Sequence, residues 1–107
     1  MNSRVALLVA GQADRRQLAG DQLYVDFDLS EHNLPAGTRL QVGLAIIEVT
    51  HPPHLGCNKF AKRFGPDARR FVNSAVGRQL RLRGLNAKVV VPGTVRVGDT
   101  IRKVSIP

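Results

Sequence analysis

The single cysteine, Cys57, is the residue in this sequence whose surroundings most favour covalent or metal chemistry. It follows a segment with two adjacent prolines, residues 51–56, and precedes a stretch suited to a short helix, residues 59–64. A helix N-terminus and nearby cations stabilise the thiolate, which is the reactive form of cysteine. The residues after Cys57 supply such cations: Lys59, Lys62 and Arg63. The pattern predicts a reactive thiol, although a small, buried and unreactive cysteine fits the spacing equally well.

Positive charge is concentrated from Cys57 onward. The chain carries 16 Lys and Arg against 8 Asp and Glu, a formal net charge of +8. Within residues 57–83 the only acidic residue is Asp67, and the basic residues are Lys59, Lys62, Arg63, Arg69, Arg70, Arg78, Arg81 and Arg83. Such a concentration indicates an anionic partner, which would be nucleic acid, a phosphate-bearing cofactor or an acidic protein.

Three arginines at the end of this block are candidates for contacts to a phosphate group: Arg78, Arg81 and Arg83. The guanidinium group of arginine binds phosphate with two parallel hydrogen bonds, which suits it to this role. Lys59 and Arg63 are further candidates for binding an anionic cofactor. A basic face that is simply solvated is the alternative reading of the same residues.

Other kinds of site have less support in the sequence. His51, His54 and Cys57 are spaced three residues apart, as zinc ligands could be, but structural zinc takes four ligands. Loop histidines in a proline-rich turn are therefore favoured over a zinc site. Nucleic-acid binding would use exposed aromatic residues among the basic ones. The aromatic residues here have the spacing of a helix core instead, and they are Phe60, Phe64 and Phe71. The sequence contains no nucleophile elbow, Gly-rich phosphate loop or paired-carboxylate pattern, which disfavours a hydrolase.

Short strands and helices are the elements expected to position these residues. Alternating patterns predict strands at 23–29, 38–42, 45–50, 87–91 and 100–106, and a further short strand at 94–97. Helices are expected within 59–74, and one or two helical turns within 3–19, capped by Asn2 or Ser3. Residues 76–86 fit no single type. Residues 1–107 should form one mainly β domain, a barrel or sandwich with two or three short helices.

A series of segments, in order along nearly the whole chain from Leu23 onward, carries a family resemblance. They are residues 25–30 (VDFDLS), 33–40 (NLPAGTRL), 47–50 (IEVT), 53–60 (PHLGCNKF), 63–65 (RFG), 71–74 (FVNS), 77–78 (GR), 80–84 (LRLRG) and 92–99 (PGTVRVGD). Together they resemble the small bacterial branch of the MOSC family, the domain named after the C-terminal part of molybdenum cofactor sulfurase. The resemblance implies a β-barrel-like domain of which this chain is the C-terminal portion, so an incomplete barrel is expected.

The resemblance also implies a chemistry for Cys57. In relatives the corresponding cysteine is thought to carry sulfur as a persulfide, or to ligate molybdenum in the molybdenum cofactor, a molybdopterin. Some relatives reduce N-hydroxylated compounds at that metal, and others are fused to a sulfurase that uses pyridoxal phosphate. The implied function is thus that of a sulfur carrier or molybdenum-cofactor-binding protein, with sulfurtransferase or reductase activity as an open expectation. Pyridoxal phosphate would take part only through a partner sulfurase.

The expected partners follow from these readings. They are the anionic pterin cofactor, a cysteine desulfurase or redox partner, and a second copy of the chain, because an incomplete barrel exposes sheet edges. A family member that binds without catalysing is the main alternative, and a basic nucleic-acid-binding domain is the less favoured one. The sequence has no evident signal peptide or membrane span. A lone cysteine fits a reducing compartment, so a cytoplasmic location is expected.

Overall fold

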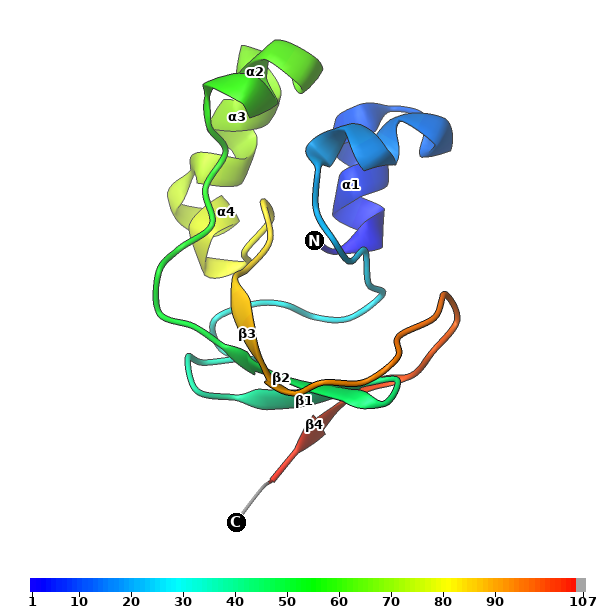
Figure 1. Ribbon diagram of the computed structural model, residues 1–107. Coiled ribbons are helices and arrows are strands. Elements are labelled where there is room, and N and C mark those ends of the chain that lie inside the picture. Colours follow the sequence, from blue (N-terminus) through cyan, green and yellow to red (C-terminus); the bar gives the residue numbers. More distant parts are fainter. Residues whose placement is uncertain (106–107) are drawn as a thin grey trace.

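The fold places a group of short helices on one side of an antiparallel sheet (Figure 1). The computed structural model describes residues 1–105, apart from the side chains of Ala13, Asp14 and Arg16. The sheet has four strands in the order β3-β2-β1-β4 and does not close into a barrel. The predicted fold class, a barrel-like sheet that stays incomplete and is joined by short helices, is therefore confirmed.

The sheet is built on a hairpin formed by β1 (Arg39–Val42) and β2 (Ala45–Val49), in which Leu40 lies opposite Ile47. The hairpin turns at Gly43, whose φ of 56° lies in the left-handed region that glycine adopts at little cost. β3 (Ala87–Val91) pairs with β2, and β4 (Ile101–Val104) pairs with β1, both antiparallel. These strands confirm the predictions at 38–42, 45–50 and 87–91. The prediction at 100–106 is confirmed for its central part, and residue 106 lies outside the described residues.

The helical layer consists of two groups that stand side by side in Figure 1. The first is α1 (Ser3–Ala10) with the 3-10 helix η1 (Ala13–Ala19), and the second is α2 (Asn58–Phe64), α3 (Pro66–Asn73) and α4 (Ala75–Gln79). Asn2 caps α1 as predicted, because its side-chain oxygen accepts hydrogen bonds from two backbone N–H groups of the first turn. Gly65, with a φ of 95°, separates α2 from α3, and Pro66 then occupies the first turn of α3.

Two apolar cores hold the layers together. The helical core is formed by Met1, Ala6, Ala19, Phe60 and Val72, and the sheet core by Leu29, Leu34, Leu40, Val42 and Val49. Leu40 and Val42 alternate with less buried residues along β1, which is the period of two expected for a strand with one buried face. The second core joins the sheet to the segment between η1 and β1, and the first joins the two helical groups.

Three sequence-based predictions differ from the structure. Residues 23–29 do not form a strand in the sheet, and only Val25 makes an isolated parallel bridge, to Asn2. The reason is local, since the Asp28 carboxylate accepts a hydrogen bond from the Ser30 N–H and turns the chain. Residues 94–97 are also not a strand. Helices are more numerous than the two or three expected, because α1, η1 and α4 are regular.

Candidate functional site

Cys57 lies at the start of α2, where it is the N-cap residue with an extended backbone. Its thiol is exposed to solvent, so the buried and unreactive alternative is excluded. The placement follows from the local sequence. The prolines at 52 and 53 keep the preceding segment out of regular structure, and Asn58 begins the helix directly after the cysteine.

Backbone N–H groups of the first turn of α2 stabilise the thiolate. The Cys57 side chain does not form a capping hydrogen bond to a backbone N–H group of α2. The N–H of Phe60, and next that of Lys59, nevertheless lie close enough to lower the pKa of Cys57 below its ordinary value. The positive charge of Arg83 lowers this pKa further, by a smaller amount. The arrangement thus favours an accessible nucleophile, as expected for a thiolate at a helix start.

The residue before the cysteine, Gly56, is held on both of its peptide groups by side chains of α3. Its N–H donates to Asn73 Oδ1 over 2.8 Å, and its carbonyl oxygen accepts from Asn73 Nδ2, also over 2.8 Å. The same carbonyl accepts from Arg69 Nε over 3.2 Å. Arg69 Nη1 also donates to Asn58 Oδ1, over 2.7 Å, and so reaches the residue after the cysteine. One helix, α3, therefore holds the backbone before Cys57 and contacts the side chain of the residue after it.

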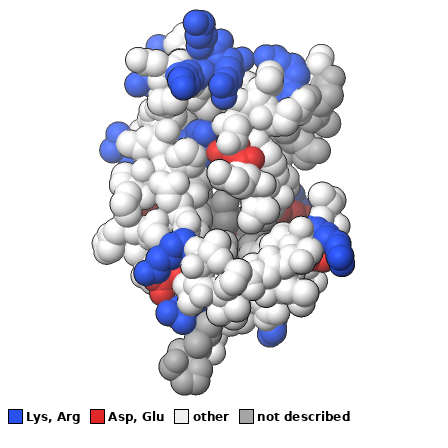
Figure 2. Space-filling model, viewed as in Figure 1, with Lys and Arg blue, Asp and Glu red and all other residues white. Residues whose placement is uncertain are grey.

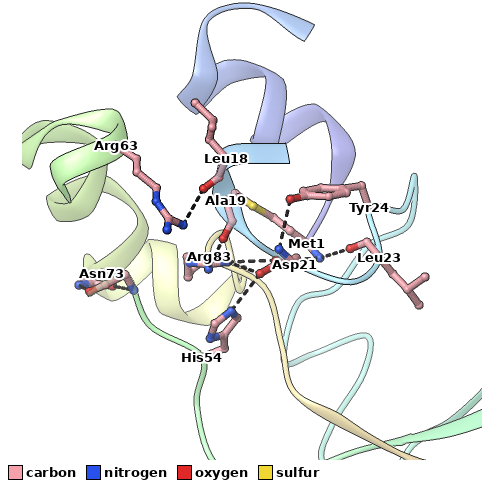
Figure 3. Close-up of polar contacts among 11 residues, drawn as sticks. Met1, Leu18, Ala19, Asp21, Leu23, Tyr24, His54, Arg63, Asn73 and Arg83 are labelled. Atoms are coloured by element: carbon pink, nitrogen blue, oxygen red, sulfur yellow. Dashed lines mark hydrogen bonds and ion pairs between the residues drawn. The ribbon is translucent and has the colours of Figure 1, made fainter. Parts of the chain in front are cut away.

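Arg83 and Asp21 form a buried ion pair beneath α2 (Figure 3). Arg83 Nη1 lies 2.9 and 3.0 Å from the two carboxylate oxygens of Asp21, and Arg83 Nη2 donates to the Ala19 carbonyl over 3.0 Å. The guanidinium carbon lies 5.1 Å from the centre of the Phe60 ring, within range of a cation–π contact. His54 Nε2 lies 3.4 Å from the same carboxylate. This network joins the loop before Cys57 to η1 and to the residues after α4.

Asp21 remains ionised in this network. Burial by itself raises the pKa of Asp21, but the contacts with His54, the N-terminal ammonium group and Arg83 outweigh burial and lower the pKa to about 2. A carboxylate with such partners keeps its charge at any pH near neutrality.

The residues predicted to bind a cofactor differ from one another in burial and in the groups that they contact. Arg83 is buried in the ion pair with Asp21. Arg81 Nη1 donates to three backbone carbonyls, including that of Leu29 over 3.1 Å, and ties α4 to the sheet core. Arg78 is exposed, and its Nε donates to the Asn73 carbonyl over 3.0 Å. Arg63 is exposed and donates to the Leu18 carbonyl over 2.9 Å, and Lys59 is exposed beside Cys57.

One cavity, of about 250 Å³, brings three of these arginines together with the proline-rich loop. Its lining includes Pro52, His54, Arg78, Arg81, Arg83 and Leu85. Its charged lining is mainly positive, with Glu31 as the acidic residue among those described, and suits a small anion.

The same cavity does not fit the molybdenum cofactor with its metal at Cys57. Cys57 is not among the described residues that line it, and its volume lies below the roughly 300–1,000 Å³ of most small-molecule sites. Arg81 and Arg83 already bind carbonyl and carboxylate oxygens of the protein. The cavity therefore suits an anion smaller than this cofactor.

Exposed cations gather over the helical end of the molecule (Figure 2). They come from α2 and α3 and include Lys59, Lys62, Arg63 and Arg70. Of the aromatic residues predicted to lie in the core, Phe60 is buried and Phe64 packs against it with ring centres 5.1 Å apart. Phe71 differs from the prediction. It is 45% exposed, because Val72 rather than Phe71 points from α3 into the core.

Two negative findings apply to residues 1–105 apart from the undescribed side chains of Ala13, Asp14 and Arg16. No group of three His, Cys, Asp or Glu side chains is arranged to hold a metal ion in this part of the chain, and His51 is exposed. Within the same residues, no helix has the length and hydropathy needed to cross a membrane.

Sequence reasoning missed Asn73, Arg69 and Asp21. Asn73 and Arg69 belong to the helix that follows α2, and only the packing of α3 against the loop brings them to Gly56. The glycine directly before the cysteine was the sequence feature that could have indicated a close approach between this loop and another element. A Cβ atom at Gly56 would lie 2.9 Å from Val72 Cγ2, so the loop can approach α3 only without a side chain there.

The comparison with known families gives one match. The sequence model of the MOSC domain matches residues 9–102, which is most of the chain. No curated protein and no solved structure matches.

Proposed function

Because the chain belongs to the MOSC domain family, we propose that it carries sulfur on Cys57 for the chemistry of the molybdenum cofactor. The observation that carries the proposal is the exposed thiol at the start of α2, with backbone N–H groups that lower its pKa. A carrier cysteine must be accessible to two partners in turn and must attack as a thiolate. Cys57 meets both requirements.

The proposed step is an exchange between a thiolate and a persulfide. Cys57 Sγ forms a bond to the outer sulfur of a persulfide on the donor protein, and the S–S bond within the donor breaks. The donor cysteine leaves as a thiolate, and Cys57 becomes a persulfide. The step needs no external oxidant or reductant, because the transferred sulfur already has the required oxidation state.

A cysteine desulfurase is the proposed donor, and it would supply the only pyridoxal phosphate in the reaction. The cations around Cys57 suit a donor with an acidic face. The proposed acceptor is the molybdenum cofactor on a second protein, since Cys57 is not among the described residues that line the arginine-lined cavity. The proposed setting is the reducing cytoplasm, where an unpaired cysteine stays reduced.

The test is sulfur loading followed by mass spectrometry. The protein is incubated with a cysteine desulfurase and cysteine, and a gain of one sulfur on the peptide that contains Cys57 is expected. Cys57→Ser should take up no sulfur while keeping its circular dichroism spectrum, because serine is nearly isosteric. A double variant, Cys57→Ser with Val97→Cys, provides an exposed thiol at a distant position as the matched control. Equal loading of Cys57 and Cys at position 97 would contradict the proposal, since loading would then reflect exposure alone.

A second candidate function is a non-catalytic module that binds a small anion. The cavity of about 250 Å³ with Arg78 in its wall favours it. Arg78→Gln is the informative variant, because Arg81 and Arg83 also hold the fold together. Calorimetry with inorganic phosphate should then give binding to the unaltered protein and weaker binding to Arg78→Gln. Equal affinities would remove this candidate.

A further inference from the structure

Asn73 and Gly56 form a pair of hydrogen bonds directly before the reactive cysteine. One carboxamide satisfies both the N–H and the carbonyl of a single residue, over 2.8 Å in each case. Those two groups belong to the two peptide units that flank Gly56, and the second unit includes the N–H of Cys57. Asn73 therefore fixes the orientation of the peptide from which the cysteine side chain projects.

Two further observations support a role for this contact at the thiol. Arg69 from the same helix donates to the Gly56 carbonyl and to Asn58, so α3 holds the chain before and after Cys57. The N–H of Cys57 is itself one of the groups that stabilise its thiolate. Donors on the Gly56 carbonyl polarise that same peptide unit and make its N–H a stronger donor.

We propose that Asn73 is a positioning residue that, together with Arg69, holds the Gly56–Cys57 peptide so that the sulfur atom faces the N–H groups at the start of α2. The proposal rests on the function proposed for Cys57 and adds the device that makes this thiol reactive. Without these side-chain hydrogen bonds, which we call the clamp, only packing against α3 restrains the Gly56–Cys57 peptide, and glycine itself adds little restriction to its φ and ψ angles. The thiol then spends less time against the helix start.

The test compares Asn73→Ala and Asn73→Asp with the unaltered protein. The rate of alkylation of Cys57 by iodoacetamide at pH 7 should fall about fivefold in Asn73→Ala, the factor that corresponds to one net hydrogen bond of about 1 kcal/mol. Asn73→Asp keeps the acceptor for the Gly56 N–H but loses the donor to its carbonyl, so its rate should be intermediate. Hydrogen exchange of the Gly56 amide should become faster in Asn73→Ala and stay slow in Asn73→Asp. Gln79→Ala removes an exposed carboxamide from α4 and is the matched control.

The outcomes separate this inference from the proposed function. A folded Asn73→Ala protein with an unchanged alkylation rate would overturn the positioning role, whatever its sulfur loading. A slower Asn73→Ala variant, in a protein that takes up no sulfur, would keep the positioning role and end the carrier proposal. If Asn73→Ala does not fold, Arg69→Met removes one donor to the same carbonyl and decides instead. A slower rate in Arg69→Met supports the clamp, and an unchanged rate overturns it.

Discussion

The thiol of Cys57 should remain reactive at a lower pH than an ordinary cysteine. Its pKa is lowered by the backbone N–H groups of Phe60 and Lys59, so at pH values below the ordinary pKa of about 8.5 a larger fraction is thiolate. The rate of alkylation should therefore decline only as the pH falls through this lowered pKa. Stopped-flow alkylation with iodoacetamide from about pH 5 to about pH 10 measures the midpoint directly.

The control for that measurement is the distant thiol of the Cys57→Ser, Val97→Cys variant. Position 97 is fully exposed and lies in the loop between β3 and β4, away from any helix start. Its alkylation midpoint should stay near the ordinary value. If both thiols titrate at the same pH, the start of α2 gives Cys57 no special reactivity.

Asp21 should contribute to stability through its ion pair with Arg83. Asp21→Asn should lower the free energy of unfolding at pH 7 by about 3 kcal/mol, because Arg83 is left buried without a carboxylate partner. The folded pKa of about 2 lies below the ordinary 3.8, so this stabilisation is complete above about pH 4 and is lost as the pH falls to about 2. Urea unfolding at several pH values measures it. Asp21 should account for about 2 kcal/mol of the stability that the unaltered protein loses across that window, and Asp21→Asn should lack this part of the loss.

At the scale of single residues, the sequence predicts the reactive thiol better than it predicts which distant residues contact each other. The exposed thiol at a helix start follows from a proline-rich loop, a cysteine and a run of helix-forming residues, which are all local. The pairing of Arg83 with Asp21 joins residues that are far apart in the chain, and nothing local identifies it. For that reason the sequence pattern indicates a phosphate contact for Arg83, whereas in the structure its side chain is buried against Asp21 and Phe60.

At the scale of elements, α4 depends on a glycine that lets it approach the end of α3. Gly77 is buried, and a Cβ atom there would collide with the backbone carbonyls of Phe71 and Val72. Gly77→Ala should therefore destabilise the protein by about 2 kcal/mol, the usual cost of overpacking. Val76→Ala, at an exposed neighbouring position, should change stability by less than about 0.5 kcal/mol. Urea midpoints of the two variants give the comparison, and equal midpoints would show that α3 and α4 can move apart freely.

The prediction of secondary structure was wrong where side chains form hydrogen bonds with backbone groups that a strand would pair. Residues 23–29 alternate as a strand does, yet Asp28 binds the Ser30 N–H, and Asn33 Nδ2 donates to the Asp28 carbonyl. These local contacts replace strand pairing. The hairpin of β1 and β2 was predictable because two short stretches rich in apolar residues flank Gly43, where the turn forms.

At the scale of the whole molecule, the exposed cations of α2 put positive charge on the helical end, beside Cys57. Exposed cations gather over the helical end (Figure 2), although Lys88, Arg96 and Lys103 are also exposed on or near the sheet. A partner that reaches the thiol therefore meets the basic end first. An acidic donor would be attracted there over a distance set by the salt concentration.

This arrangement predicts a salt-dependent rate of sulfur transfer. Replacing Lys59 and Lys62 by glutamine removes two exposed charges beside Cys57 and should slow transfer from the desulfurase on the order of tenfold at about 0.01 M ionic strength. The difference should shrink at about 0.5 M salt, because screening then already suppresses the attraction.

Replacing Arg96 and Lys103 by glutamine removes the same charge at the sheet end and should leave the rate within about twofold of the original, since these charges lie away from the thiol. Alkylation by neutral iodoacetamide should be nearly equal in all three proteins, because backbone N–H groups rather than the charges of Lys59 and Lys62 lower the pKa of Cys57. This comparison separates attraction of the donor from reactivity of the thiol. If both double variants slow transfer equally, net charge rather than a basic face guides the partner. Tight binding of random duplex DNA that Lys59 and Lys62 dominate would instead favour a nucleic acid as the partner of this face.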